Sequence, residues 1–203
     1  MALFPNLIFL SLLVLGIGLF ARNISRIRRN ILIGKEVYRS DNKSLRWSHM
    51  IRVALGQSKM STRPLAAFLH LIVYVGFILI NIELLEIVLD GLIGSHRLFA
   101  PFLGILYNFL IGTFEVFAFL VLISVIVFWT RRNVVRIKRF WKPEMKGWPK
   151  RDADFILYFE VVLMLLFLSM NATDSILQDR GVETYINAGS FPISQFLYPL
   201  FDG

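Results

Sequence analysis

Long apolar stretches, separated by polar and basic segments, dominate the chain. A helix needs about 20 mostly apolar residues to cross the hydrocarbon core of a bilayer. Four stretches meet this requirement, and we predict a membrane span in each of them: residues 3–21, 65–89, 109–130 and 153–177. The pattern therefore predicts an all-α fold, a polytopic membrane helix bundle of about four transmembrane helices plus interfacial helices.

Three segments beside the spans carry weaker patterns. Residues 98–108 contain Pro101 and Gly104, which predicts a short interfacial or re-entrant helix. Residues 45–59 place apolar side chains at helical spacing, which predicts an amphipathic helix that lies on the inner leaflet or packs on a partner. Residues 191–201 are apolar but too short to cross a bilayer, so we expect an outer interfacial segment.

These segments give a simple division of the chain. We predict a transmembrane helix bundle over residues 1–177, followed by an outer loop and interfacial segment over residues 178–203. The short apolar end has the character of an incomplete C-terminus, so we expect the protein to continue beyond Gly203.

The composition supports a membrane protein and excludes several other classes. The chain has 203 residues, of which 56% are hydrophobic and only 18% charged, whereas soluble domains have about a quarter charged. It has no cysteine, which excludes iron–sulfur ligation, disulfides and thiolate catalysis by these residues. It also lacks the motifs GxSxG, HExxH, GxGxxG and the P-loop. We therefore expect enzymatic activity only as part of a longer protein or a complex.

The positive charge is distributed unevenly along the chain. Of the 22 lysines and arginines, eleven lie between Arg22 and Arg63, nine lie between Arg131 and Arg151, and the others are Arg97 and Arg180. By the positive-inside rule, both basic segments are cytoplasmic and both termini are outside. The net charge of +8 then reports topology and contact with anionic headgroups rather than a nucleic-acid partner. Since no positive charge precedes the first apolar stretch, we expect a retained anchor rather than a signal peptide.

Ionisable groups inside the second span point to its neighbours. At 100° per residue, His70, Phe77 and Asn81 share one face, and Glu83 and Glu86 lie on a roughly opposite face. We therefore expect this span to be central, with neighbours on both sides. At its depth in the membrane, a neutral His70 is suited to ligate a haem iron, to bond a carbonyl group of the next helix, or to bond a quinone.

Four carboxylates are candidates for proton or quinone chemistry. Glu83, Glu86 and Glu115 lie toward the outer side of their spans, where Asp174 joins them, and Glu160 lies on the inner side of the fourth span. Carboxylates that cluster in a low dielectric share protons, which suits a proton port for quinone chemistry or transport. The alternative is that they form hydrogen bonds that hold the helices together.

The histidines do not assemble into a pair of haem ligands. His70 and His96 are 26 residues apart, or about 40 Å along a continuous helix, so they do not bind the two faces of one haem. His49 belongs to the amphipathic segment. We therefore expect any second haem ligand to come from outside this chain.

Two short runs of the sequence resemble a known family. Residues 54–60 read Ala-Leu-Gly-Gln-Ser-Lys-Met and are followed by Arg63–Pro64, His70 and the run Val-Gly-Phe at 75–77. The run Trp-Pro-Lys-Arg-Asp-Ala-Asp at 148–154 opens the fourth span. Together they resemble the N-terminal membrane domain of bacterial heterodisulfide-reductase-related (Fe–S)-binding proteins, whose membrane region is similar to the gamma subunit of respiratory nitrate reductase.

The resemblance implies a function in electron transfer. It implies a membrane anchor of a quinone-linked oxidoreductase in the bacterial cytoplasmic membrane, in which b-type haem links the quinone pool to a cytosolic iron–sulfur module. It also implies that His70 is a haem ligand, that the iron–sulfur clusters lie in a further module or partner, and that electron-transfer flavoprotein is a candidate electron donor. The alternatives are a membrane scaffold without redox chemistry and a small transporter that uses the carboxylates.

Overall fold

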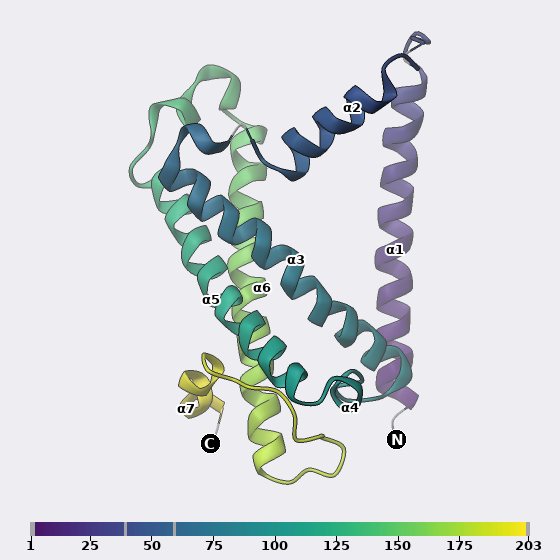
Figure 1. Ribbon diagram of the computed structural model, residues 1–203, viewed down its shortest axis with the longest axis vertical. Coiled ribbons are helices and arrows are strands. Elements are labelled where there is room, and N and C mark those ends of the chain that lie inside the picture. The colour runs from purple at the N-terminus through teal and green to yellow at the C-terminus, as the bar shows by residue number, and fades with distance from the viewer. Residues whose placement is uncertain (1–2, 39, 59, 202–203) are drawn as a thin grey trace. The chain divides into compact units, whose positions relative to one another are not determined.

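The structure, a computed structural model, describes residues 3–38, 40–58 and 60–201. Over this part of the chain, every regular element is a helix. Four helices are long and apolar enough to cross a membrane: α1 (Leu3–Leu32), α3 (Pro64–Ile93), α5 (Ile105–Asn133) and α6 (Trp148–Asp179) (Figure 1). The predicted all-α membrane fold with four spans is therefore confirmed.

Each spanning helix is longer than its predicted apolar stretch, because polar residues continue the helix past the hydrocarbon core. The largest change concerns residues 98–108, which do not form a separate helix. Only Ala100–Leu103 forms a single turn, α4, and Gly104 ends it with a φ of 53° that favours glycine. Residues 105–108 are the first turn of α5. Similarly, α6 begins at Trp148, where Pro149 occupies its first turn, so the helix starts before the predicted residue 153.

The chain divides into two compact units, and the first consists of residues 1–67 with 91–94. It contains α1, α2 (Lys43–Met50), a π-helical segment η1 (Ile51–Leu55) and a short 3₁₀ turn η2 (Met60–Thr62). The amphipathic helix predicted over residues 45–59 therefore forms, but it ends at Leu55, and its last predicted residue, Lys59, lies outside the described residues. Its placement on a leaflet or on a partner stays a prediction.

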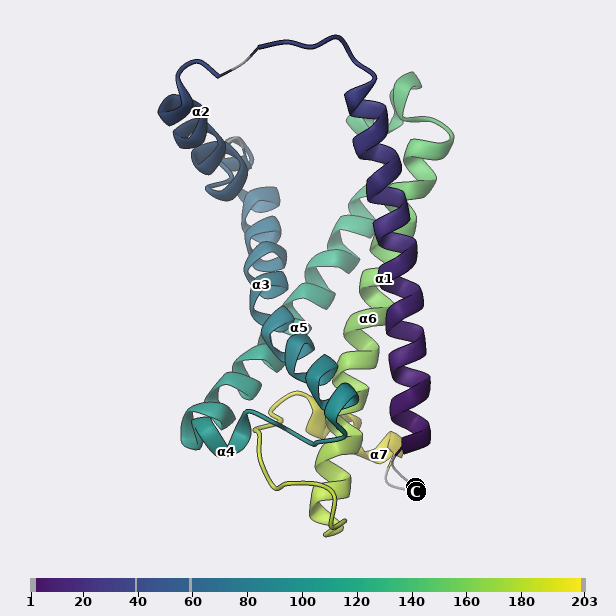
Figure 2. The ribbon, with the colours of Figure 1, turned by 90° about the vertical axis from the view of Figure 1, so that its right-hand side faces the viewer.

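The second unit consists of residues 68–90 and 95–203, and it holds the main core. Within it, α5 and α6 lie side by side (Figure 1 and Figure 2). The core contains buried apolar side chains from α3, α5 and α6: Ile80, Ala118, Val121, Val125, Met164 and Leu168. Gly76 of α3 faces α5, and a Cβ atom at this position would lie 2.5 Å from Cγ2 of Val121. A glycine is therefore required at this crossing.

The C-terminal segment, residues 191–201, packs in part against the helices, and its place at the outer interface stays a prediction. It forms a 3₁₀ turn, η5 (Ser194–Leu197), and a single helical turn, α7 (Tyr198–Phe201), and both contact α6 (Figure 1). Ser194 is completely buried, whereas Phe196 and Leu200 are 75% exposed. Half of the segment is therefore part of the packed unit, because its polar backbone finds partners there.

We expect Gly76→Ala to destabilise the second unit by about 1–3 kcal/mol, because the new methyl group collides with Val121. The unfolding free energy in detergent measures this effect. Adding Val121→Ala should restore part of the loss, since it removes the colliding atom. Gly16→Ala is the matched control, because no atom lies within 4 Å of a Cβ there. An equal loss at both glycines would contradict the close crossing.

Candidate functional site

Two carboxylates from the end of α3 shape the turn that follows this helix. Asp90 accepts hydrogen bonds from the backbone N–H groups of Arg97 (2.9 Å) and Leu98 (3.2 Å) and from the hydroxyl group of Ser95 (2.6 Å). One oxygen of Glu86 accepts a bond from the N–H group of Phe99 (2.7 Å). These bonds hold Arg97 at a φ of 56°, a left-handed conformation that costs energy for a residue with a Cβ. The turn therefore directs the Arg97 side chain into the unit.

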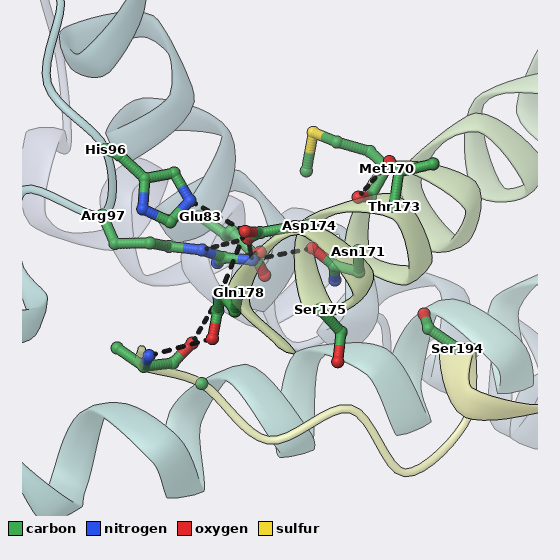
Figure 3. A network of polar contacts seen from close by, with 12 residues as sticks. Glu83, His96, Arg97, Met170, Asn171, Thr173, Asp174, Ser175, Gln178 and Ser194 are labelled. Carbon is green, nitrogen blue, oxygen red and sulfur yellow. Dashed lines mark hydrogen bonds and ion pairs between the residues drawn. The ribbon is translucent and has the colours of Figure 1, made fainter. Parts of the chain in front are cut away.

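Arg97 is 5% exposed, and its guanidinium group meets acceptors from three long helices. Figure 3 shows those on α3 and α6. The N–H groups of Arg97 face the following atoms: Nε faces Asp174 Oδ2 (2.8 Å), Nη1 faces Glu83 Oε1 (2.9 Å) and the Tyr107 hydroxyl oxygen (3.3 Å), and Nη2 faces Asn171 Oδ1 (2.9 Å) and Asp174 Oδ2 (2.7 Å). Four of the five N–H donors of the guanidinium group make these hydrogen bonds, and Nη2 also forms an ion pair with Asp174. Arg97 therefore joins α3, α5 and α6.

Opposing effects act on the charge of Arg97. Burial lowers its pKa. The neighbouring Glu83, Tyr107 and Asp174 raise the pKa by more than burial lowers it, so the pKa lies above the ordinary value. The guanidinium group is therefore a permanent cation. A buried cation of this kind is stable only while its carboxylate partners remain in place.

His96, beside Arg97, is held in one tautomer. The backbone N–H group of Ile186 donates to Nδ1 (3.0 Å), so this nitrogen carries no proton in the bonded state. Nε2 then carries the proton and donates it to Asp174 Oδ1 (2.8 Å). The Tyr185 ring packs against the imidazole, with 4.5 Å between the ring centroids. His96 therefore links the loop after α6 to the Arg97 network (Figure 3).

The same loop has a second attachment, and its Tyr185 contributes to the lining of a small pocket. Gln178 exchanges hydrogen bonds with the backbone N–H and C=O groups of Ala188, both 3.1 Å long, and also donates to Asp174. A cavity of about 210 Å³ lies beside the network. Its polar lining residues include Glu86, Asp90, Ser95, His96, Arg97 and Thr173. Most of these polar groups bond to other parts of the protein, so the lining is fixed by internal contacts.

Glu115 forms a separate buried site. One of its oxygens accepts bonds from the backbone N–H groups of Ile193 (3.0 Å) and Ser194 (3.2 Å), and the other accepts a bond from the Ser194 hydroxyl group. The Ser194 hydroxyl oxygen also lies 2.9 Å from the carbonyl oxygen of Leu168 on α6. Glu115 therefore anchors the C-terminal segment to α5 and α6.

The structure brings only some of the predicted carboxylates together. Glu83, Glu86 and Asp174 meet around Arg97 and Tyr107, whose hydroxyl group donates to Glu86 (2.7 Å). Glu115 bonds the C-terminal segment instead. Glu160 is half-buried on α6 and has no hydrogen bond or ion pair among the described residues. The four candidates therefore have different environments.

His70 lies apart from all of these groups, near the start of α3. It is half-buried, and its ring has no hydrogen bond to the described part of the chain. On the same face, Phe77 is 63% exposed, and exposed Asn81 bonds only the carbonyl oxygen of Phe77. No helix of the same unit packs against this face among the described residues. We expected neighbours on both faces of α3, and within the unit they are found only on the face that carries Glu83. Among the described residues, no group of three or more histidines or carboxylates is arranged to hold a metal ion.

The sequence analysis did not identify the centre of the network. It assigned Arg97 only to the outer side and did not single out Tyr107 or Ser194. A usable signal was present, because Arg97 is the only lysine or arginine between residues 64 and 130, where three carboxylates of α3 and Glu115 also lie. A lone cation among membrane carboxylates is expected to pair with them.

Comparison with protein-family models, curated proteins and solved structures gives no match for this chain. The resemblance to heterodisulfide-reductase-related proteins therefore stays a prediction.

We expect Arg97→Gln to lower the unfolding free energy in detergent by about 3–5 kcal/mol, because it leaves Glu83 and Asp174 buried without a cation. Arg97→Lys should be intermediate, since lysine keeps the charge but has fewer donors. The exposed Arg151 is the matched control, and Arg151→Gln should change stability by no more than about 0.5 kcal/mol. Equal effects of the two glutamine variants would contradict the role of Arg97.

Proposed function

We propose that this chain is the membrane anchor of a quinone-linked electron-transfer oxidoreductase in a bacterial cytoplasmic membrane. In this proposal the basic segments face the cytoplasm, where an iron–sulfur module or electron-transfer flavoprotein exchanges electrons with the anchor. The sequence resemblance suggests the class of protein. The observation that carries the proposal is the open face of α3 around His70.

Three features of this face support the proposal that His70 is a haem ligand. The His70 ring is half-buried, is not used in a hydrogen bond among the described residues, and lies on a face where Phe77 is largely exposed. A neutral imidazole in this setting would suit a haem iron as a ligand. When bound, b-type haem supplies a one-electron carrier. In the same unit, both ring nitrogens of His96 are already bonded, so a second histidine ligand would come from outside residues 68–203.

The environments of the carboxylates favour Glu160 as the group that exchanges protons with quinone. Glu83, Glu86 and Glu115 are buried and hold fixed hydrogen bonds to Arg97, Tyr107 and the C-terminal segment. Glu160 is half-buried and has no such partner among the described residues. An ionisable group inside a span, without a structural partner, is a candidate for proton transfer. Glu160 can therefore gain or lose a proton without breaking the packing of the unit.

A membrane scaffold without redox chemistry is the second candidate. The hydrogen bonds of Arg97 favour it, because they join α3, α5 and α6 to one another. In that case, His70 and Glu160 would contact a neighbouring helix of a partner.

We expect His70→Ala to abolish the b-haem signal of the protein purified from its native membrane with its partners. The reduced-minus-oxidised absorbance spectrum measures this signal. His49→Ala is the matched control, because His49 lies on the exposed α2 and should leave the spectrum unchanged. An unchanged spectrum in His70→Ala, or no haem in the unaltered protein, would remove the redox proposal and leave the scaffold.

We expect Glu160→Gln to slow quinone-linked electron transfer by about tenfold or more, because the amide cannot carry the proton. The amount of folded protein and the haem spectrum should not change. Glu144→Gln is the control, since Glu144 is exposed in the loop before α6. A normal rate in Glu160→Gln would assign proton transfer to another group.

A further inference from the structure

The loop between α5 and α6 is the most strongly charged segment of the second unit. Residues 131–151 contain nine lysines and arginines but only one acidic residue, Glu144. So many like charges repel one another unless anions neutralise them. Arg131 shows that acceptors are lacking in this segment, because its Nη1 atom is buried and has no hydrogen-bond partner among the described residues.

The loop is nevertheless fixed in place at both of its ends. Arg132 is buried, pairs with Asp154 at 2.9 Å and donates to the carbonyl oxygen of Lys150 at 3.1 Å. Asn133 donates to the same carboxylate at 3.1 Å. The Trp141 indole N–H group donates to the carbonyl oxygen of Arg132 at 3.3 Å. These bonds connect the end of α5 with the start of α6 and leave the loop little freedom.

Aromatic rings hold several of the cations. The guanidinium carbon of Arg136 lies 5.2 Å from the centroid of the Trp141 ring, and the ammonium nitrogen of Lys150 lies 4.1 Å from it. Arg139 is placed over Phe140 in the same way, at 4.6 Å. A ring attracts a cation but does not cancel its charge. Arg136 and Lys150 therefore both lie against the Trp141 ring, and their charges remain available to an anion.

The position of the loop indicates which kind of anion is available to these cations. Only 14 residues, 134–147, connect the two membrane-spanning helices, so the loop stays close to the bilayer surface. Tryptophan and tyrosine favour the headgroup region, and here Trp129 donates to Tyr158 (3.1 Å) near the loop, while Trp148 is 67% exposed. The anion nearest to such a surface is the phosphate group of a lipid.

We propose that Arg136, Lys150 and the Trp141 ring between the loop ends form a binding site for the phosphodiester headgroup of an anionic phospholipid. The two cations bond the phosphate oxygens, and the indole ring lies against the glycerol backbone. The site goes beyond electron transfer and does not depend on bound haem. A lipid bound at this site would fix how deeply α5 and α6 lie in the membrane at the end where the basic loop connects them.

The test compares two double variants with the same net charge. Arg136→Gln with Lys150→Gln removes the ring-held cations, whereas Lys142→Gln with Lys146→Gln removes two exposed cations of the same loop. The full chain is placed in nanodiscs of equal parts phosphatidylglycerol and phosphatidylcholine. Native mass spectrometry then counts the phospholipids that stay bound after release. Thermal unfolding and circular dichroism verify that both variants are folded.

We expect the unaltered protein to retain phosphatidylglycerol over phosphatidylcholine. The Arg136/Lys150 variant should lose about tenfold or more of this preference, and the Lys142/Lys146 variant less than about twofold. Equal losses in both variants would mean a general surface attraction and would overturn the site. Equal retention of the two lipids by the unaltered protein would also overturn it. Unchanged lipid retention in the Arg136/Lys150 variant, with weaker binding of an acidic soluble partner, would assign the surface to a protein instead.

If the Arg136/Lys150 variant does not fold, Arg136→Lys with Lys150→Arg provides the second measurement. This exchange keeps both charges and both ring contacts but changes the donor geometry toward phosphate. A shift in the number of bound phosphatidylglycerol molecules, with normal folding, supports the site. No shift in that number would contradict it.

Discussion

The second unit depends on one buried cation that three helices share. Arg97 lies on the turn after α3, yet its side chain pairs with Glu83 of α3, Asp174 of α6 and the hydroxyl group of Tyr107 on α5. In a membrane, lipid is as apolar as the helix surfaces, so apolar contacts alone provide little preference for one packing over another. A permanent cation that requires carboxylates from defined positions does provide that preference. The network therefore specifies the arrangement, and the apolar core fills the space that this arrangement leaves.

This role of Arg97 gives the two ends of the unit different properties. At the Arg97 end, carboxylates neutralise the cation inside the protein, and the loop after α6 covers the network through His96 and Gln178. At the opposite end, the basic loop holds its cations against aromatic rings without matching anions, which suits a charged membrane surface. Between the two ends, the face of α3 around His70 stays open in the unit. The proposed haem contact and the proposed lipid site thus use surfaces that internal packing does not occupy.

The sequence predicted the helices better than the contacts between them. Hydropathy located all four spans because each is a continuous apolar stretch, but it missed the ends, since charged residues such as Arg132 and Asp152 continue the helices outside the hydrocarbon. Helical spacing put Glu83 and Glu86 on one face of α3, and that face is buried. It did not reveal that Arg97 turns back to meet them, because the turn depends on Asp90 bonding three groups that follow it in the chain. Likewise, no periodicity indicates that Ser194 returns to Glu115, 79 residues away.

The most direct test of this account is the energetic coupling between Arg97 and Asp174. The unfolding free energies of Arg97→Gln, Asp174→Asn and the double variant form a double-mutant cycle. If the pair organises the unit, the double variant should lose about 1–3 kcal/mol less than the sum of the single losses, because the second substitution removes a charge that the first left unpaired. Losses that simply add would contradict the account, since they would mean that the two side chains stabilise the helices independently.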